Sequence, residues 1–197
     1  FQNPTKPIGV FYSEEEAKRL TEEKGWIVKE DAGRGWRRVV PSPMPKAIIG
    51  ADLIQSLTDQ ENIVIAAGGG GIPVSRQSDG TLVGVEAVIG IYKDRSGYQL
   101  AQDVNADIFM ILTDVENVYV NYGKPNQKSL ETISLEEAKQ YADEGQFSAG
   151  SMGPKMESAI GFAEKGGTAI ICSLDQADLA LAGKAGTRIT QAISSAK

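Results

Sequence analysis

Histidine is absent from this chain of 197 residues, and cysteine occurs once. Without histidine there is no Ser-His-Asp triad and no histidine ligand for a metal. With one cysteine there is no disulfide within the chain, which is typical of proteins from a reducing compartment, so we expect a cytoplasmic protein. The cysteine, Cys172, follows the apolar Ala169, Ile170 and Ile171. We expect it to be buried in a strand and to have a structural role.

An excess of positive charge and a long hydrophobic run are also lacking. Lysine and arginine total 20 against 26 aspartates and glutamates, a formal net charge of −6. The chain therefore has no overall basic character to favour nucleic acid as a partner. No apolar stretch approaches the roughly 20 residues that cross a bilayer, and the first residues do not resemble a signal peptide. Catalysis would have to use lysine, arginine, carboxylates and backbone N–H groups, which are the groups that stabilise a phosphate during transfer.

The first 45 residues differ in character from the rest, since they hold both tryptophans and a dense mixture of charges. Ser13-Glu-Glu-Glu16 is a capping box, which predicts a helix from Glu14 to Lys24 that ends at Gly25. Residues 26–30 and 36–40 predict two short strands. We expect residues 1–45 to form a small subdomain with a minor core of its own.

Residues 46–197 alternate strands and helices, which predicts a second, α/β domain. Apolar runs at 63–67, 108–112 and 168–172 predict three buried strands, and Asp79-Gly80 predicts a tight turn between short strands. Helices are predicted over 96–104, from the capping box Ser134-Leu-Glu-Glu137 to near Gly145, over 154–165 and up to Leu181, with a short strand at 187–190. Continuous apolar strands separated by helices favour a mostly parallel sheet covered on both faces.

Three loops follow predicted strands or open a helix, where ligands of such sheets bind. In the first, Gly69, Gly70 and Gly71 follow a strand, and their lack of side chains lets backbone N–H groups approach an anion. The alternative is a flexible turn, but ordering consecutive glycines is costly, so we favour phosphate binding. The loop matches neither the Walker pattern nor the dinucleotide fingerprint, so the glycines alone leave the ligand unnamed.

The second loop is Gly150-Ser-Met-Gly-Pro-Lys155 at a helix start. The free N–H groups and the helix dipole favour an anion there. Lys155 stands where Asp or Glu is usual, which is useful if a phosphate binds at the same point; the alternative is a lysine that faces solvent. We predict that Met152, Gly153 and Lys155 contact a nucleotide.

The third loop is Thr113-Asp114-Val115 at a strand end. The carboxylate of Asp114 could order nearby lysines, meet Mg²⁺ or hydrogen-bond a nucleotide, although Asp is also a common N-cap. Tyr119 follows, and either it flanks an adenine or it packs in the core. Several other charged residues are, on their own, consistent either with solvated or salt-bridged surface or with anion-binding groups. They are Lys6, the pair Lys93-Asp94, and Arg34, Arg37 and Arg38.

Together these segments resemble carbamate kinases, which are members of the amino acid kinase superfamily. The motifs, which occur in order along nearly the whole chain, are Asn3-Pro-Thr-Lys-Pro-Ile-Gly9, Glu30-Asp-Ala-Gly-Arg-Gly-Trp-Arg-Arg38, Val39-Val-Pro-Ser-Pro43, Gly69-Gly-Gly-Ile-Pro73, Gly84-Val-Glu-Ala-Val-Ile89, Ile111-Leu-Thr-Asp-Val115, Gly150-Ser-Met-Gly-Pro-Lys155 and Gly186-Thr-Arg-Ile189. The resemblance implies a three-layer αβα sandwich, a protruding subdomain at residues 1–45, and a cytoplasmic homodimer.

The resemblance also implies an activity, which is phosphoryl transfer between ATP and carbamate, with carbamoyl phosphate coming from arginine breakdown. The cofactors would be ATP or ADP with Mg²⁺, with no metal ligand assigned among the side chains. Lys155 would bind the nucleotide phosphates, Lys93 the transferring group, and Lys6 would cover the site from the subdomain. Asp94 and Asp114 would order these cations. Positioning and charge neutralisation suffice for in-line transfer, so no covalent enzyme intermediate is expected.

Two departures from the family lead to alternatives. The strand and Gly-Gly-Asn loop with which the family begins have no counterpart here, so we expect a chain that lacks the family's N-terminal region. Gly90-Ile-Tyr92 replaces the aspartate that usually precedes the Lys-Asp pair. The first alternative is a catalytically impaired nucleotide-binding or regulatory protein. The second is another amino acid kinase that acts on an amino-acid carboxylate or a nucleotide, against which the subdomain argues.

Overall fold

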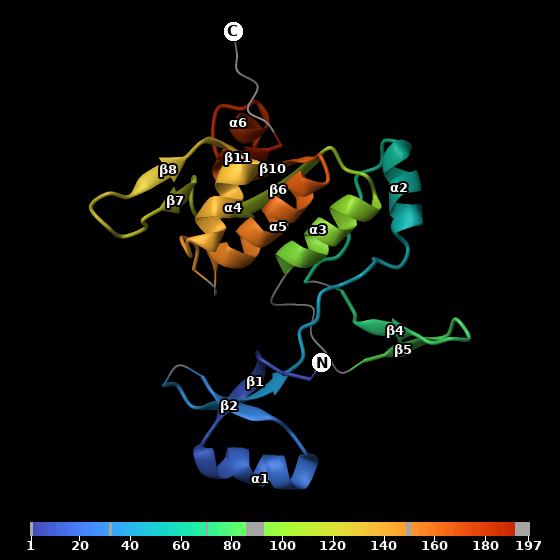
Figure 1. The fold of residues 1–197 in the computed structure, drawn as a ribbon. Coiled ribbons are helices and arrows are strands. Elements are labelled where there is room, and N and C mark those ends of the chain that lie inside the picture. Colours follow the sequence, from blue (N-terminus) through green and yellow to red (C-terminus); the bar gives the residue numbers. More distant parts are fainter. Residues whose placement is uncertain (1, 32, 70, 86–92, 149–150, 192–197) are drawn as a thin grey trace. The chain divides into compact units, whose positions relative to one another are not determined.

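The computed structural model describes residues 2–31, 33–69, 71–85, 93–148 and 151–191 (Figure 1). The chain divides into two compact units. The first contains Phe1–Pro45 and Ala67–Lys93, and the second contains Lys46–Ala66 and Asp94–Lys197. One division between these units falls after residue 45, and residues 67–93 group with residues 1–45.

The first unit contains a three-stranded antiparallel sheet and one helix. The strands are β1 (Lys6–Tyr12), β2 (Val28–Glu30) and β3 (Trp36–Val40), in the order β1-β3-β2. Helix α1 (Glu14–Lys24) begins at the predicted capping box, where the Ser13 hydroxyl accepts from the Glu16 N–H at 3.2 Å, and it ends at Gly25, whose φ is +64°. The buried Ala17 and Leu20 of α1 supply its minor core. A hairpin of β4 (Val74–Arg76) and β5 (Leu82–Gly84) turns at Asp79-Gly80, as predicted.

The second unit is built on a four-stranded sheet. The strands are β6 (Ile108–Thr113), β9 (Thr132–Ser134), β10 (Thr168–Ser173) and β11 (Thr187–Thr190), in the order β6-β10-β11-β9. The pairs β6/β10 and β11/β9 are parallel, and β10/β11 is antiparallel. The sheet is mostly parallel, as the apolar runs predicted.

Helices cover both faces of this sheet. Successive side chains of β10 point to opposite faces, and Ala169 and Ile171 belong to the larger hydrophobic cluster, with residues of α3 (Lys93–Asp103), α4 (Leu135–Asp143) and α5 (Met152–Glu164). Figure 1 shows these three helices side by side on that face. Ile170 and Cys172 pack on the opposite face with Ala180 of α6 (Ala177–Leu181), which follows the 3₁₀ helix η2 (Leu174–Gln176). The expected three-layer arrangement and the expected burial of Cys172 are both present, and burial raises the pKa of the Cys172 thiol.

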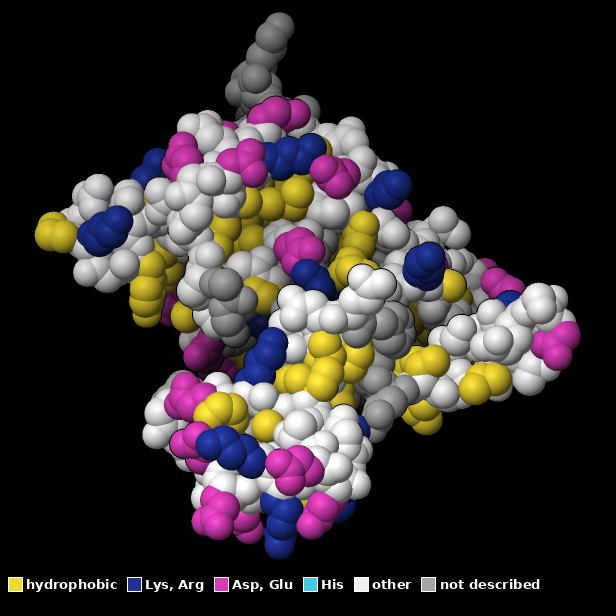
Figure 2. All heavy atoms as spheres, turned by 60° about the horizontal axis from the view of Figure 1, so that its bottom comes forward, with side chains coloured by type: hydrophobic (Ala, Val, Ile, Leu, Met, Phe, Trp, Pro, Cys, Tyr) yellow, Lys and Arg dark blue, Asp and Glu magenta, His cyan; other side chains and the backbone are white. Residues whose placement is uncertain are grey.

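The remaining elements of the second unit are α2 (Ala51–Asp59) and the hairpin of β7 (Val118–Val120) with β8 (Lys128–Leu130). Among the described residues, no helix combines the length and the apolar character that crossing a bilayer requires. Figure 2 shows acidic and basic side chains interspersed over the visible face, in keeping with the small net charge.

The prediction of a buried strand at residues 63–67 is wrong. Residues 62–67 adopt no regular secondary structure, and Ile63 and Ile65 are 97% and 96% exposed. A strand requires a neighbour that takes up its backbone hydrogen bonds, and no described strand pairs with this segment. Hydrophobic composition alone therefore misled the prediction. The start of α5 also differs by two residues, since the helix begins at Met152 and not at Pro154.

Candidate functional site

A cavity of about 520 Å³ lies at the C-terminal end of β6, within the second unit. Its lining comes from the end of β6, the region of β7, the turn after α4 and the start of α5. The lining residues are Thr113, Asp114, Val115, Tyr119, Asn121, Tyr122, Lys124, Gly145, Gln146, Phe147, Ser148, Ser151, Met152 and Lys155. Ligands of open α/β sheets bind beyond the carboxyl ends of the strands, where this cavity lies.

Five residues that the sequence predicted for nucleotide binding line this cavity. They are Asp114, Val115, Tyr119, Met152 and Lys155. They lie in, or directly follow, two of the three loops selected from the sequence. These two loops come together because helix α5 packs against strand β6. The remaining loop, with Gly69 and Gly71, belongs to the first unit. Gly71 has a φ of +92°, and Gly70 lies outside the described residues.

The start of α5 has the features of an anion-binding helix end. No side chain caps it, and its first turn contains no acidic residue, whereas α1 and α4 both begin with capping boxes and glutamates. The Gly153 N–H donates to the Ser148 carbonyl at 2.8 Å. A Cβ at position 153 would lie 2.9 Å from that oxygen, so the close turn requires glycine here. The Gly153 N–H is thus engaged and Pro154 has none, so the helix dipole and the remaining N–H groups of this end are what attract a phosphate or carboxylate group.

Lys155 forms an ion pair with Asp94 of α3. Its Nζ lies 3.2 Å from Oδ2 and 3.4 Å from Oδ1 of Asp94, and the two side chains are 17% and 9% exposed. The solvent-facing alternative for Lys155 is therefore wrong. Two residues that sequence analysis had assigned to the reaction are brought together, although they are far apart in the sequence.

An aromatic side chain, that of Tyr119, also lines the cavity. Val118 and Val120 are buried, so Tyr119 between them projects away from the core, is half-buried and lines the cavity. Its ring centroid lies 6.2 Å from that of Tyr122, which is 71% exposed. Of the two alternatives for Tyr119, the geometry favours a ligand-facing ring over a core side chain.

Sequence reasoning missed the turn after α4. Gln146 accepts a hydrogen bond from the Asn121 N–H at 2.9 Å, and the Ser148 and Ser151 hydroxyls lie 2.6 Å apart. These contacts join the turn to β7 and to α5. The sequence position of Gly145-Gln-Phe-Ser148, directly before the glycine-rich start of α5, could have indicated that these residues line the same site.

The other predicted residues lie outside this lining as far as the structure describes it. Lys93 is the exposed first residue of α3. Lys6 is the first residue of β1 in the first unit and is half-buried; burial, with a smaller effect of the Arg37 charge, lowers the pKa of its ammonium group. Gly90, Ile91 and Tyr92, where the sequence departs from the family, lie outside the described residues.

Carboxylates that could hold a metal do not gather in the described part of the chain. No group of three or more histidine, cysteine, aspartate or glutamate side chains is arranged there as a metal site. Asp114 is the exposed carboxylate of the cavity lining and accepts a hydrogen bond from the Thr113 hydroxyl at 3.0 Å. This arrangement fits an ion held mainly by ligand oxygens, as Mg²⁺ is in many phosphate-transfer sites.

Comparison with known proteins identifies the family. The model of the amino acid kinase family matches residues 13–173. The carbamate kinase of Thermococcus kodakarensis is 57% identical over 192 residues, which are 97% of this chain and 60% of that protein. The carbamate kinase of Pyrococcus furiosus is 57% identical over 190 residues, 96% of this chain and 60% of that protein.

A solved structure agrees with these sequence matches. The carbamate kinase of Giardia lamblia bound to AMP-PNP has a TM-score of 0.90 and 49% identity, covering 96% of this chain and 60% of that chain. The chain spans about 60% of the length of these relatives. Since the family model matches most of the sequence, the chain belongs to the amino acid kinase family, and the relatives named here are carbamate kinases.

Proposed function

We propose that the chain carries the nucleotide-binding part of a carbamate kinase, which transfers a phosphoryl group reversibly between ATP and carbamate. The observation that carries this proposal is the cavity at the end of β6, in which the Asp94-paired Lys155 lies at the uncapped start of α5. The cavity volume of about 520 Å³ falls in the range of roughly 300–1,000 Å³ usual for small-molecule sites.

The lining residues suit a nucleotide. Lys155 and the N–H groups at the start of α5 would bind phosphate oxygens, since both present positive charge at the same point. The ring of Tyr119 would flank the adenine, and Met152 would add a further apolar contact. The AMP-PNP complex of the Giardia lamblia relative supports a nucleotide ligand. Mg²⁺ would neutralise charge on the phosphates, held by them and by Asp114.

The remaining predicted residues would serve the transfer itself. Lys93 would stabilise the transferring phosphoryl group, and Lys6 of the first unit would provide a further positive charge. Asp94 would hold Lys155 in place and compensate its charge in the absence of nucleotide. In-line transfer asks for positioning and charge neutralisation, which lysines and backbone N–H groups supply without a covalent intermediate. Gly69, Gly70 and Gly71 would add backbone N–H donors for a phosphate. Because the chain resembles carbamate kinases, we also propose that the protein is a cytoplasmic homodimer.

The experiment is ATP formation from ADP and carbamoyl phosphate with Mg²⁺, catalysed by the purified chain and its Lys155→Ala and Lys165→Ala variants. Lys165 is the exposed C-cap residue at the other end of α5, so its variant controls for removing a lysine from the same helix. Turnover that disappears only in Lys155→Ala would support the proposal. Turnover that is equal in all three proteins would remove Lys155 and the cavity from the reaction.

A second candidate function is nucleotide binding without turnover. Its support is the sequence Gly90-Ile-Tyr92, which replaces the aspartate that usually precedes the Lys-Asp pair in the family. Binding of ADP in calorimetry, together with no ATP formation, would favour it. Phosphorylation of glutamate, aspartate or UMP without transfer from carbamoyl phosphate would instead indicate another amino acid kinase.

A further inference from the structure

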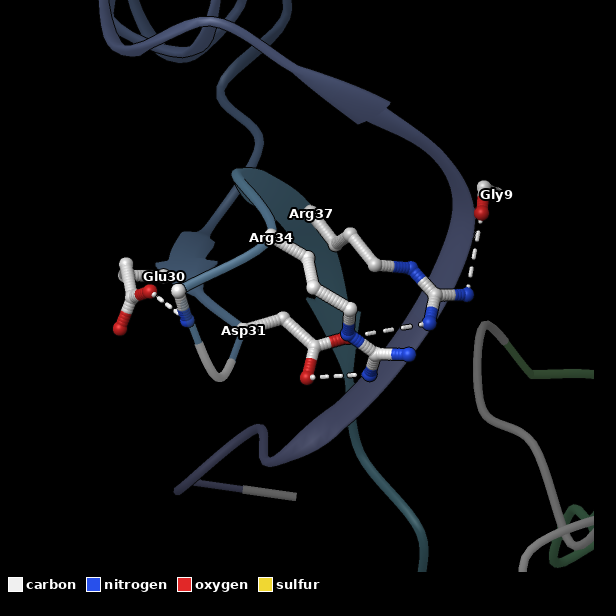
Figure 3. Close-up of polar contacts among 6 residues, drawn as sticks. Gly9, Glu30, Asp31, Arg34 and Arg37 are labelled. Atoms are coloured by element: carbon white, nitrogen blue, oxygen red, sulfur yellow. Dashed lines mark hydrogen bonds and ion pairs between the residues drawn. The ribbon is translucent and has the colours of Figure 1, made fainter.

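The loop between β2 and β3 is attached to β1 by one arginine (Figure 3). Asp31 in this loop accepts from Arg34 Nη2 at its Oδ1 and from Arg37 Nη1 at its Oδ2, each at 3.2 Å. Arg37 extends further, since its Nη2 donates to the carbonyl of Gly9 in β1 at 3.0 Å. Glu30 secures the same loop by accepting from the Gly33 N–H. Arg37 therefore links a loop carboxylate to the backbone of a strand that lies 28 residues away.

Gly9 lies where β1 departs from regular pairing. Lys6, Pro7 and Ile8 pair in antiparallel register with Val40, Val39 and Arg38 of β3, after which the register shifts before Tyr12 pairs with Trp36. Gly9 has a φ of +70°, a left-handed conformation that favours glycine. The carbonyl at this irregular position is the one that Arg37 binds, so a side chain helps to hold the bulge in place.

The loop makes two further contacts with the irregular part of β1. The ring of Phe11 lies close to both arginines, with its centroid 5.1 Å from the guanidinium carbon of Arg34 and 5.0 Å from that of Arg37. A Cβ at Gly35, whose φ is +122°, would lie 3.0 Å from the Tyr12 carbonyl, which shows how closely the loop approaches the strand. The loop thus contacts β1 at Phe11 and Tyr12, and Arg37 at the start of β3 contacts it at Gly9.

Arg37 differs from Arg34 in burial as well as in reach. The Arg37 side chain is 23% exposed and that of Asp31 17%, whereas Arg34 is 63% exposed. Hydrogen bonds, first from Arg37 and then from Arg34, hold the pKa of Asp31 below its ordinary value, so the carboxylate stays charged at neutral pH. Charge-assisted hydrogen bonds between partly buried groups are among the stronger polar contacts in proteins.

The register of β1 matters because Lys6 is its first residue. β1 is an edge strand with β3 as its one neighbour in the described sheet, and its regular pairing before the bulge covers three residues. A slip of one residue would turn every side chain of a strand to the opposite face of the sheet. Short, irregular edge strands are prone to such slips, and a bulge fixed by a side chain prevents them.

We propose that Arg37, held by Asp31, is a positioning residue that fixes the bulge of β1 at Gly9 and thereby sets the face and position of Lys6. The inference deepens the proposed function, in which Lys6 takes part in phosphoryl transfer. In this role Arg37 does not contact the substrate itself. Arg34 shares the carboxylate and the aromatic ring but makes no contact with the Gly9 carbonyl, so it provides the matched comparison.

The test compares the purified chain with its Arg37→Gln and Arg34→Gln variants by hydrogen exchange and by turnover. In Arg37→Gln we expect amide exchange over residues 6–12 to rise about tenfold or more, the effect of losing one charge-assisted hydrogen bond. Exchange in α1 should stay unchanged. Arg34→Gln should leave residues 6–12 within about twofold of the parent, since the contact that it loses is largely exposed.

Turnover adds a readout that a purely structural role would not move. For ATP formation from ADP and carbamoyl phosphate, Arg37→Gln should lower kcat about tenfold with the KM for ADP little changed, because Lys6 is misplaced while the nucleotide cavity is intact. Arg37→Lys keeps the charge, but its single nitrogen replaces a two-nitrogen bridge, so it should restore little of the lost rate.

The outcomes separate this inference from the proposed function. If the parent chain shows no turnover, the proposed function fails, and hydrogen exchange still decides whether Arg37 fixes β1. Equal exchange over residues 6–12 in the two glutamine variants would overturn the inference. A rise that extends through α1 would overturn it too, since Arg37 would then stabilise the whole unit. Raised exchange in β1 with kcat no lower than in Arg34→Gln would show that the position of Lys6 does not depend on Arg37.

Discussion

Lys155 of α5 and Asp94 of α3 form an ion pair in which Nζ lies 3.2 Å from Oδ2. In the described part of the chain, Asp94 is the one charged residue that is buried. Burying a carboxylate is costly unless a cation compensates it, so the pair makes each of these residues depend on the other. A second pair with reversed charges, Arg95 Nη2 to Glu157 Oε2 at 2.5 Å, joins the same two helices, one residue further along α3 and two residues further along α5. The two pairs fix how α3 and α5 meet at the edge of the cavity.

The first prediction concerns nucleotide affinity. Lys155→Ala should weaken ADP binding tenfold or more, because a charge-assisted phosphate contact of roughly 1.5–3 kcal/mol is lost. Isothermal titration calorimetry measures this effect, with Lys165→Ala as the control at the far end of α5. Unchanged affinity in Lys155→Ala would mean that nucleotide does not bind at the start of α5.

The second prediction separates binding from transfer. Lys93→Ala should lower kcat far more than it lowers the affinity for ADP, because Lys93 would act on the group that is transferred. Lys139→Ala is a suitable control, since Lys139 pairs with Glu164 at 2.8 Å on the surface and is 47% exposed. If kcat and affinity fell by equal factors, Lys93 would contribute to ground-state binding instead.

The third prediction concerns the base. Tyr119→Ala should weaken ADP binding by about 1–3 kcal/mol, the usual contribution of an aromatic ring stacked on a base. Binding of inorganic tripolyphosphate should stay unchanged, since it has no base to contact the ring. Lys155→Ala, by contrast, should weaken both ligands. Equal losses of ADP and tripolyphosphate binding in Tyr119→Ala would show that the ring shapes the cavity without contacting adenine.

Local sequence signals predicted much of the fold. The capping boxes at Ser13 and Ser134 begin α1 and α4 as expected, because their hydrogen bonds lie within four residues and need no tertiary partner. The apolar runs at 108–112 and 168–172 form adjacent parallel strands. The loops at Asp114 and Lys155 were predicted to bind one ligand, and they line one cavity.

What the sequence did not predict depends on contacts between distant residues. β1 was not predicted; it contains Pro7 and Gly9, residues unfavourable in strands, and pairing with β3 accommodates both, Gly9 at the bulge. The ion pair of Asp94 with Lys155 joins residues that are 61 positions apart, which no periodicity reveals. The opposite error occurred at Ile63 and Ile65, where apolar composition predicted a buried strand and the structure has exposed side chains. Strand formation there would need a neighbouring strand, which composition does not report.

The fourth prediction tests this exposed segment. Ile63→Ser and Ile65→Ser should each change the free energy of unfolding by less than about 0.5 kcal/mol, because nothing packs on side chains that are 97% and 96% exposed. Ile171→Ala, at a position that is 0% exposed in β10, should cost about 2–5 kcal/mol. Urea denaturation of the three variants measures these differences. A loss in Ile65→Ser comparable with that in Ile171→Ala would show that residues 63–67 are buried by other chain segments in solution.

The fifth prediction concerns pH and follows from Lys6. Burial and, to a smaller degree, the positive charge of Arg37 lower the pKa of Lys6. In the pH range just below the ordinary lysine pKa, the unfolded chain therefore binds more protons at this position than the folded chain does. The free energy of unfolding should gain a contribution that rises with pH across that range.

Two variants assign this pH dependence. Lys6→Met should remove the contribution, and Arg37→Gln should reduce it, because it removes the Arg37 charge and releases the strand that holds Lys6 in its half-buried position. Urea denaturation at a series of alkaline pH values measures the slope, with Lys29→Met, on an exposed position of β2, as the control for deleting one lysine. A slope that is the same in Lys6→Met as in the parent would mean that Lys6 keeps an ordinary pKa, and that neither burial nor Arg37 disfavours its charge.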